Sequence, residues 1–141
     1  MDQLSRRHLP LFLSALAAAQ AQGSGEHLAS DVFPFDNLPV HEGKTSTSRQ
    51  IFRGISHSGC PVDLHETDLP PGQMPHPPHR HSNEEVLMIV SGQVDVTING
   101  KTKTIGPGSA AYVASNDYHG WKNSGTTMAR YFVMSVGPTN T

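Results

Sequence analysis

Three histidines and one glutamate give this sequence its clearest chemical signal. His79 and His81 are two residues apart, and Glu85 follows four residues after His81. Side chains at even spacing on a strand point to the same face, so a gently bent strand would bring the two imidazoles and the carboxylate together. His119 lies in a later strand segment and could complete the set across a sheet. Such nitrogen and oxygen donors suit a divalent transition metal, with Fe, Mn, Ni, Cu, Co and Zn all compatible.

Four protein ligands would leave room at such a metal for a small-molecule substrate. A metal that accepts six ligands keeps two positions for water, dioxygen or substrate, which is the pattern of a catalytic site. Glu85 is the carboxylate among these four expected ligands. The alternative is a polar barrel rim without metal, but burying four convergent ionisable groups in that way is costly.

The neighbouring polar residues have other expected roles. Glu84 has the wrong parity to join the site and should lie on the surface. His76, three residues before the first histidine, should stand at the rim, where it could touch substrate. Trp121 shares the parity of His119 and is a candidate for the pocket wall. Asn123 should order a turn through backbone hydrogen bonds.

The order and spacing of these residues resemble the two cupin motifs. The first motif, G-x5-H-x-H-x3-4-E-x6-G, is matched, with one extra residue in its first gap, by Gly72, His79, His81, Glu85 and Gly92. The second motif, P-x-G-x2-H-x3-N, is similar to a stretch with a longer central gap, made by Pro107, Gly108, His119 and Asn123. The resemblance covers residues 60–136, which is nearly all of the expected domain.

The cupin resemblance implies an all-β fold, a single double-stranded β-helix or jelly-roll barrel with about six to eight strands. It implies a metal inside the barrel mouth, bound by the residues matching His79, His81, Glu85 and His119. The activity it favours is dioxygenase-like oxidation of a small hydroxylated or enolisable molecule, in which Glu85 would be a metal ligand that also accepts the substrate proton and so the catalytic residue. A Lewis-acid isomerase or lyase and a non-catalytic small-molecule or sugar-binding protein are the alternatives. Cupins also commonly form homodimers, so we expect one here.

Short strands broken by glycine and proline must position these residues. Apolar or alternating runs predict strands over residues 61–69, 85–90, 94–98, 101–105, 110–114, 118–122 and 127–136. Asn99-Gly100 supplies a two-residue hairpin turn between two of them. Frequent turn signals without helical periodicity indicate an all-β sandwich or barrel. We assign the barrel to residues 50–138 and an extended arm to residues 22–49, which lack a sustained period.

Residues 1–21 have the pattern of an export signal peptide. A basic pair, Arg6-Arg7, precedes an uncharged apolar run from Leu9 to Ala19, and small residues for a signal peptidase follow. The apolar run is too short to cross a bilayer as a helix. The basic pair also resembles the twin-arginine export motif. We therefore expect a periplasmic or otherwise exported protein that does not associate with a membrane after cleavage.

Length and composition exclude several classes of protein. A chain of 141 residues fits one compact domain. With 10 Lys+Arg against 12 Asp+Glu, the net charge is −2, which leaves no basic surplus for phosphates, so no nucleic-acid partner is expected. Cys60 is the only cysteine, which excludes an internal disulfide and a site with several thiolate ligands.

Overall fold

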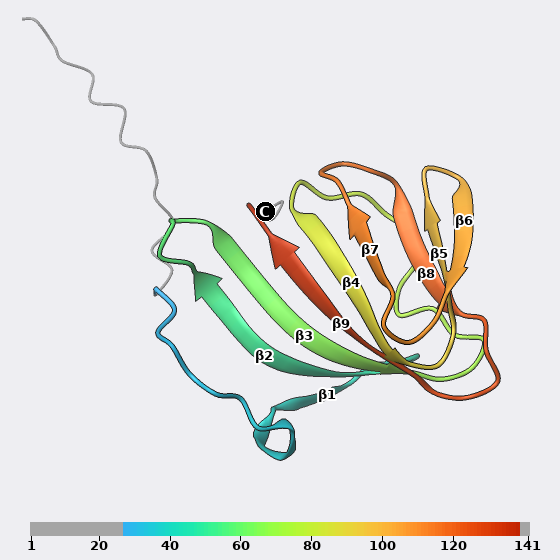
Figure 1. Cartoon of the computed structure of the whole chain (residues 1–141), viewed down its shortest axis with the longest axis horizontal. Coiled ribbons are helices and arrows are strands. Elements are labelled where there is room, and N and C mark those ends of the chain that lie inside the picture. The colour runs from blue at the N-terminus through green and yellow to red at the C-terminus, as the bar shows by residue number, and fades with distance from the viewer. Residues whose placement is uncertain (1–26, 139–141) are drawn as a thin grey trace, which may run out of the picture.

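A computed structural model describes residues 27–138, which form an almost entirely β structure (Figure 1). A short 3-10 helix, η1 (Phe35–Asn37), precedes the strands. The strands are β1 (Val40–Glu42), β2 (Thr47–Ile55), β3 (Pro61–Leu69), β4 (Glu84–Ser91), β5 (Val94–Ile98), β6 (Lys101–Ile105), β7 (Ala110–Val113), β8 (His119–Asn123) and β9 (Ala129–Val136). The expected signal peptide, residues 1–21, lies outside the described residues. Within residues 27–138, no helix is long and apolar enough to cross a membrane.

The strands form two antiparallel sheets. The larger sheet has the strand order β1-β2-β3-β9-β4-β7, and the smaller one has the order β6-β5-β8. Figure 1 shows the smaller sheet beside β4 and β7, while β2 and β3 lie at the far side of the larger sheet. The chain therefore passes from one sheet to the other before and after the β5–β6 hairpin. This arrangement confirms the predicted all-β fold of the jelly-roll type.

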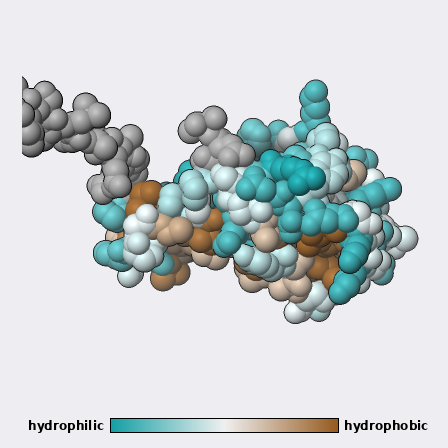
Figure 2. Space-filling model, turned by 90° about the horizontal axis from the view of Figure 1, so that it is seen from above, coloured by the Kyte–Doolittle hydropathy of each residue, from teal (hydrophilic) through white to brown (hydrophobic). Residues whose placement is uncertain are grey.

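Alternating side chains separate a buried face from an exposed face. Leu87 and Ile89 of β4 are buried, whereas Met88 and Val90 between and after them are 38% and 48% exposed. Figure 2 shows hydrophobic side chains reaching the surface in separate patches between hydrophilic ones. The core joins both sheets through the buried side chains of Leu69, Leu87, Ile89, Val94, Val96, Trp121, Ala129, Tyr131 and Val133. Each large apolar side chain buried here stabilises the fold by about 1.5–3 kcal/mol.

Two regions differ from the strand assignments made on the sequence. The segment expected to be an extended arm contains β1 and the start of β2, where Thr47 to Arg49 pair with β3. Polar side chains at these positions concealed the strand, because the alternation of apolar residues was absent. The second difference is that His79 and His81 lie outside the named strands. Of these two histidines His79 makes an isolated bridge, and its partner is His119.

An ion-pair cluster joins η1 to the larger sheet. Glu66 of β3 is fully buried, and its Oε2 accepts a hydrogen bond of 2.8 Å from Arg49 Nη1. The Nε atom of Arg130 lies 2.8 Å from both Glu66 Oε1 and Asp68 Oδ1, and it donates its hydrogen bond to Asp68. The ring of Phe35 lies over both guanidinium groups, 4.6 and 4.8 Å from them. Cation–π contacts therefore hold η1 against β2 and β9.

We predict that the Asp68→Asn variant loses an acid-sensitive part of the stability. The guanidinium of Arg130, helped by that of Arg49, holds the pKa of the Asp68 carboxyl below its ordinary value. Such a group stabilises the fold above its unfolded pKa, about 3.9, and this contribution disappears as the pH falls through the lower folded pKa. Urea unfolding should show wild type more stable than Asp68→Asn at about pH 6, with the difference shrinking below about pH 4. A difference that stayed constant over this range would contradict the ion-pair explanation.

We predict that Gly92→Ala destabilises the fold much more than Gly100→Ala. Both glycines have positive φ, +81° and +78°, so alanine is strained at either position, by about 1–2 kcal/mol. At Gly92 a Cβ would also lie 2.6 Å from the Ala129 Cα, whereas at Gly100 it would meet nothing within 4 Å. The combined cost at Gly92 should be about 3 kcal/mol or more. Equal midpoints of urea unfolding for the two variants would show that the close approach to β9 is unimportant.

Candidate metal centre

The candidate centre is built where a loop meets the first residue of β8. The His79 N–H donates to the His119 carbonyl at 2.9 Å, and the His119 N–H donates back to the His79 carbonyl at 3.0 Å. Gly120 makes room for this approach, since a Cβ there would lie 3.0 Å from Cγ and 3.2 Å from Cα of Pro78. The bridge thus places two histidines side by side although only one of them belongs to a strand.

The ring nitrogens of His79, His81 and His119 lie within 4.8 Å of one another. The Nδ1 atoms of His81 and His119 each lie 2.8 Å from a backbone carbonyl, of Asn83 and Asp117 respectively. A carbonyl can only accept, so these Nδ1 atoms carry the proton and the lone pairs are at Nε2. Both Nε2 atoms, and Nδ1 of His79, are buried without a hydrogen-bond partner among residues 27–138. Unpaired, buried ring nitrogens of this kind suit a metal ion.

The carboxylate of Glu85 approaches these rings from β4 in the other sheet. Its Oε1 lies 3.3 Å from His81 Nε2, and its Oε2 lies 3.2 Å from His119 Nε2, neither with hydrogen-bond geometry. Ser135 Oγ donates to Oε1. With metal–ligand bonds of about 2.1 Å, neighbouring ligand atoms are about 3.0 Å apart in an octahedron and about 3.4 Å apart in a tetrahedron. The two nitrogen–oxygen distances fall between these values, so His81, His119 and Glu85 are spaced as ligands of one ion would be.

Burial favours the neutral form of His79, which is the form that can bind a metal. Desolvation lowers the pKa of the His79 imidazole, and the neighbouring His76, His119 and His81 lower it further, against an opposing effect of Glu85. A ring with a lowered pKa is unprotonated at neutral pH and keeps its lone pair. Metal binding at this residue therefore requires no loss of a proton near pH 7.

The four residues come together by a different route from the one that their spacing suggested. His79 and His81 precede β4 in a loop beside the smaller sheet, whereas Glu85 is the second residue of β4 in the larger sheet. The bend at residues 82–83 joins the two parts. It is the facing of two sheets, rather than even spacing along one strand, that directs the carboxylate toward the histidines.

The positions of the neighbouring residues agree in part with the sequence predictions. Glu84 is exposed, as its parity predicted. His76 is also exposed, but its ring lies only 4.5 Å from that of His79 and 5.9 Å from that of Trp121, closer than its odd spacing suggested. Trp121 is buried and stacks at 5.9 Å on His119, so the shared parity was a correct guide.

The sequence reasoning missed the groups that orient the histidines. The carbonyls of Asn83 and Asp117 fix the proton on two rings, and each lies two residues from the histidine that it orients. Gly120, which admits the loop, directly follows a histidine but carried no separate signal. The role of Asn123 is confirmed, since its buried side chain donates to two backbone carbonyls at 2.7 and 2.8 Å.

Comparison with protein families agrees with this fold. Residues 65–135 match the Cupin domain family. The chain belongs to the cupin family. The matched stretch runs from β3 to β9, about half of the chain, and contains the three histidines and the glutamate of the centre. A search of curated proteins found no match to this cupin.

Several solved structures share the fold at low sequence identity. An RmlC-like cupin from Shewanella frigidimarina is 18% identical, with a TM-score of 0.64 over 77% of this chain and 93% of its own. The polyketide cyclase RemF from Streptomyces resistomycificus is 19% identical, with a TM-score of 0.64 over 81% and 83% of the two chains. A predicted oxalate decarboxylase from Thermotoga maritima is 19% identical, with a TM-score of 0.63 over 77% and 100%. These names differ in activity, so the likeness extends to the fold alone.

We predict that Gly120→Ala weakens metal binding without removing a ligand. The added methyl group would push Pro78, and with it the bridged His79, away from β8. Loss of such positioning typically lowers metal affinity by 10–100-fold, so we expect about tenfold. Competition with a chelator measures the affinity. Gly106→Ala is the control, since its Cβ would have one ordinary contact at 3.8 Å. Equal affinity in both variants would contradict the role given to the close approach.

Proposed function

We propose that this cupin is a metal-dependent enzyme, dioxygenase-like, that oxidises a small hydroxylated or enolisable organic molecule. The observation that carries the proposal is the set of buried, unpaired donor atoms at His81, His119 and Glu85, with His79 beside them. Leaving such atoms unpaired costs about 1–3 kcal/mol each, more for the charged one, unless something binds them. A divalent transition metal fits their type and spacing, and the four side chains would hold it.

A redox-active metal at this position would supply a centre at which substrate and dioxygen can exchange electrons. The chain's own contribution begins with Glu85, whose Oε2 has no hydrogen-bond partner within residues 27–138 and can accept a proton from a substrate hydroxyl or an acidic C–H. Ser135 holds the other oxygen of this carboxylate, so the position of the accepting atom is defined. The carbonyls of Asn83 and Asp117 keep two imidazoles in one tautomer throughout.

Two further polar groups lie behind His119, since Trp121 stacks on its ring and Tyr131 lies against Trp121. The Trp121 indole N–H and the Tyr131 hydroxyl are buried, and neither has a hydrogen-bond partner in the described part of the chain. The two rings are 6.0 Å apart. Burial raises the pKa of the Tyr131 hydroxyl, which therefore remains a proton donor at physiological pH. Both groups could orient an oxygen of the substrate by donating a hydrogen bond to it.

Elemental analysis and oxygen uptake test the proposed function. The protein purified from cells should carry about one equivalent of Fe, Mn, Ni or Cu, and the double variant His79→Ala/His119→Ala should lose it because two of the ligands are gone. A His41→Ala/His57→Ala variant, which removes two exposed histidines, is the matched control and should retain the metal. Glu85→Gln should lower oxygen uptake with a screened substrate by about a hundredfold or more, because it removes the proposed proton acceptor.

The outcomes of this experiment separate the alternatives. Zinc alone, without oxygen uptake, would replace the oxidation by Lewis-acid chemistry such as isomerisation or elimination. A metal without turnover of any substrate would favour the binding protein. Absence of metal from both wild type and the double variant would overturn the metalloenzyme proposal.

A further inference from the structure

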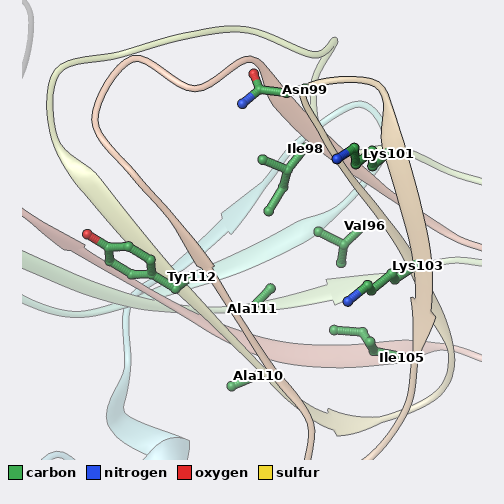
Figure 3. Close-up of a pocket in the computed structure, with 9 residues that line it drawn as sticks. All are labelled: Val96, Ile98, Asn99, Lys101, Lys103, Ile105, Ala110, Ala111 and Tyr112. Atoms are coloured by element: carbon green, nitrogen blue, oxygen red, sulfur yellow. The ribbon is translucent and has the colours of Figure 1, made fainter.

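A slot opens between β6 of the smaller sheet and β7 of the larger one. Its volume is about 420 Å³, within the range of small-molecule sites. Val96, Ile98 and Ile105 form an apolar floor, and the small side chains of Ala110 and Ala111 on β7 leave the opposite wall low (Figure 3). Both strands are edge strands of their sheets, so no neighbouring strand of residues 27–138 covers the opening.

Two lysines face this slot from β6. In the β5–β6 ladder Lys101 pairs with Ile98 and Lys103 with Val96, so both lysines share the face of β5 that points into the core. Figure 3 shows their amino groups on the slot side of the strand. Within residues 27–138, neither amino group has a salt bridge or a side-chain hydrogen bond, and no acidic residue lines the slot. An apolar floor beneath two cations is therefore complementary to a molecule with an apolar body and one anionic end.

We infer that the slot binds an amphipathic organic anion, such as a medium-chain or aromatic carboxylate. The apolar part would lie on Ile98 and Ile105, and the carboxylate would meet Lys101 and Lys103 at the opening. This inference goes beyond the proposed oxidation and stands on the slot alone, whether or not a metal is bound.

The slot lies close to the candidate metal centre but is distinct from it. Ile98 pairs with Lys101 on one side and with His119 on the other, so the three residues form a row across the smaller sheet. With strands about 4.8 Å apart, the Cα atoms of Lys101 and His119 are roughly 10 Å apart. A carboxylate in the slot could therefore be held either by the lysines or at the histidines, and a test must separate these two positions.

Octanoate and 1-octanol form a matched pair of probes, which differ in charge at one end. Methyl NMR spectra of the whole protein would follow both titrations through the signals of Ile98 and Ile105. We expect octanoate to shift these signals and to bind about tenfold more tightly than octanol, since two exposed ion pairs together contribute about that factor. The Lys101→Gln/Lys103→Gln variant should bind octanoate only as tightly as it binds octanol. The control Lys122→Gln, an exposed lysine of β8 that does not line the slot, should leave both affinities unchanged.

A second variant and a second background complete the test. Ala111→Leu should fill the slot and lower the affinity for both probes. The lysine variant changes only exposed side chains, so a loss of octanoate binding there would not result from a folding defect. The His79→Ala/His119→Ala protein should still bind octanoate, which separates this inference from the fate of the proposed metalloenzyme. If this double variant no longer bound octanoate, the carboxylate would be held at the histidines and not in the slot, and the inference would be overturned. Unchanged octanoate affinity in the lysine variant would also overturn it, and would leave those lysines the role of preventing edge-to-edge strand pairing.

Discussion

Two backbone hydrogen bonds between His79 and His119 are the contact on which the site depends. The loop from β3 to β4 starts and ends in the larger sheet, yet it must present imidazoles beside the smaller one. Further backbone contacts secure it, because Gly72 donates to the carbonyl of Asn123, and Asn116 donates to that of His81. A loop with these attachments behaves as an added strand at the edge of β8, so ligands outside regular structure still have defined positions.

The same arrangement concentrates polar atoms in a part of the molecule that should otherwise be apolar. His119 is 1% exposed and lies beside the buried Trp121, while Glu85 reaches the same point from the facing sheet. Burying polar atoms without partners weakens a fold, so the remainder of the structure must supply the stability. It does so through a core shared by both sheets and through the paired charges of Glu66 with Arg49 beneath η1.

Much of the fold could be predicted because its strands carry local signals. The Asn99-Gly100 turn is present with positive φ at both residues, and it fixes the pairing of Ile98 with Lys101. That pairing, with ordinary alternation, was enough to place Lys101 on an inward face, although the sequence reasoning did not draw this conclusion. β2 was missed because its pairing depends on β3 rather than on its own polar residues.

That these four side chains lie close together could be predicted, but the way in which they converge could not. His79, His81, Glu85 and His119 have the expected types and order, and these depend on the sequence alone. Their convergence depends on a bend at residues 82–83 and on loop carbonyls whose directions no side-chain pattern encodes. Rules of parity apply within a strand and lose their meaning once the chain changes sheets.

The topology also has a consequence for the folding kinetics of this protein. β9 lies between β3 and β4 in the larger sheet, so the last strand of the chain must insert between two strands that are made much earlier. Pairings between such distant segments form slowly, because the entropy of closing the loop is lost before the contacts are gained. β8, which begins at His119, is joined to β9 by a short loop, and Ser135 on β9 donates a hydrogen bond to Glu85. The contact that orients the Glu85 carboxylate therefore forms only when β9 has paired with β4, and a metal ion that binds the folded protein would stabilise it against unfolding.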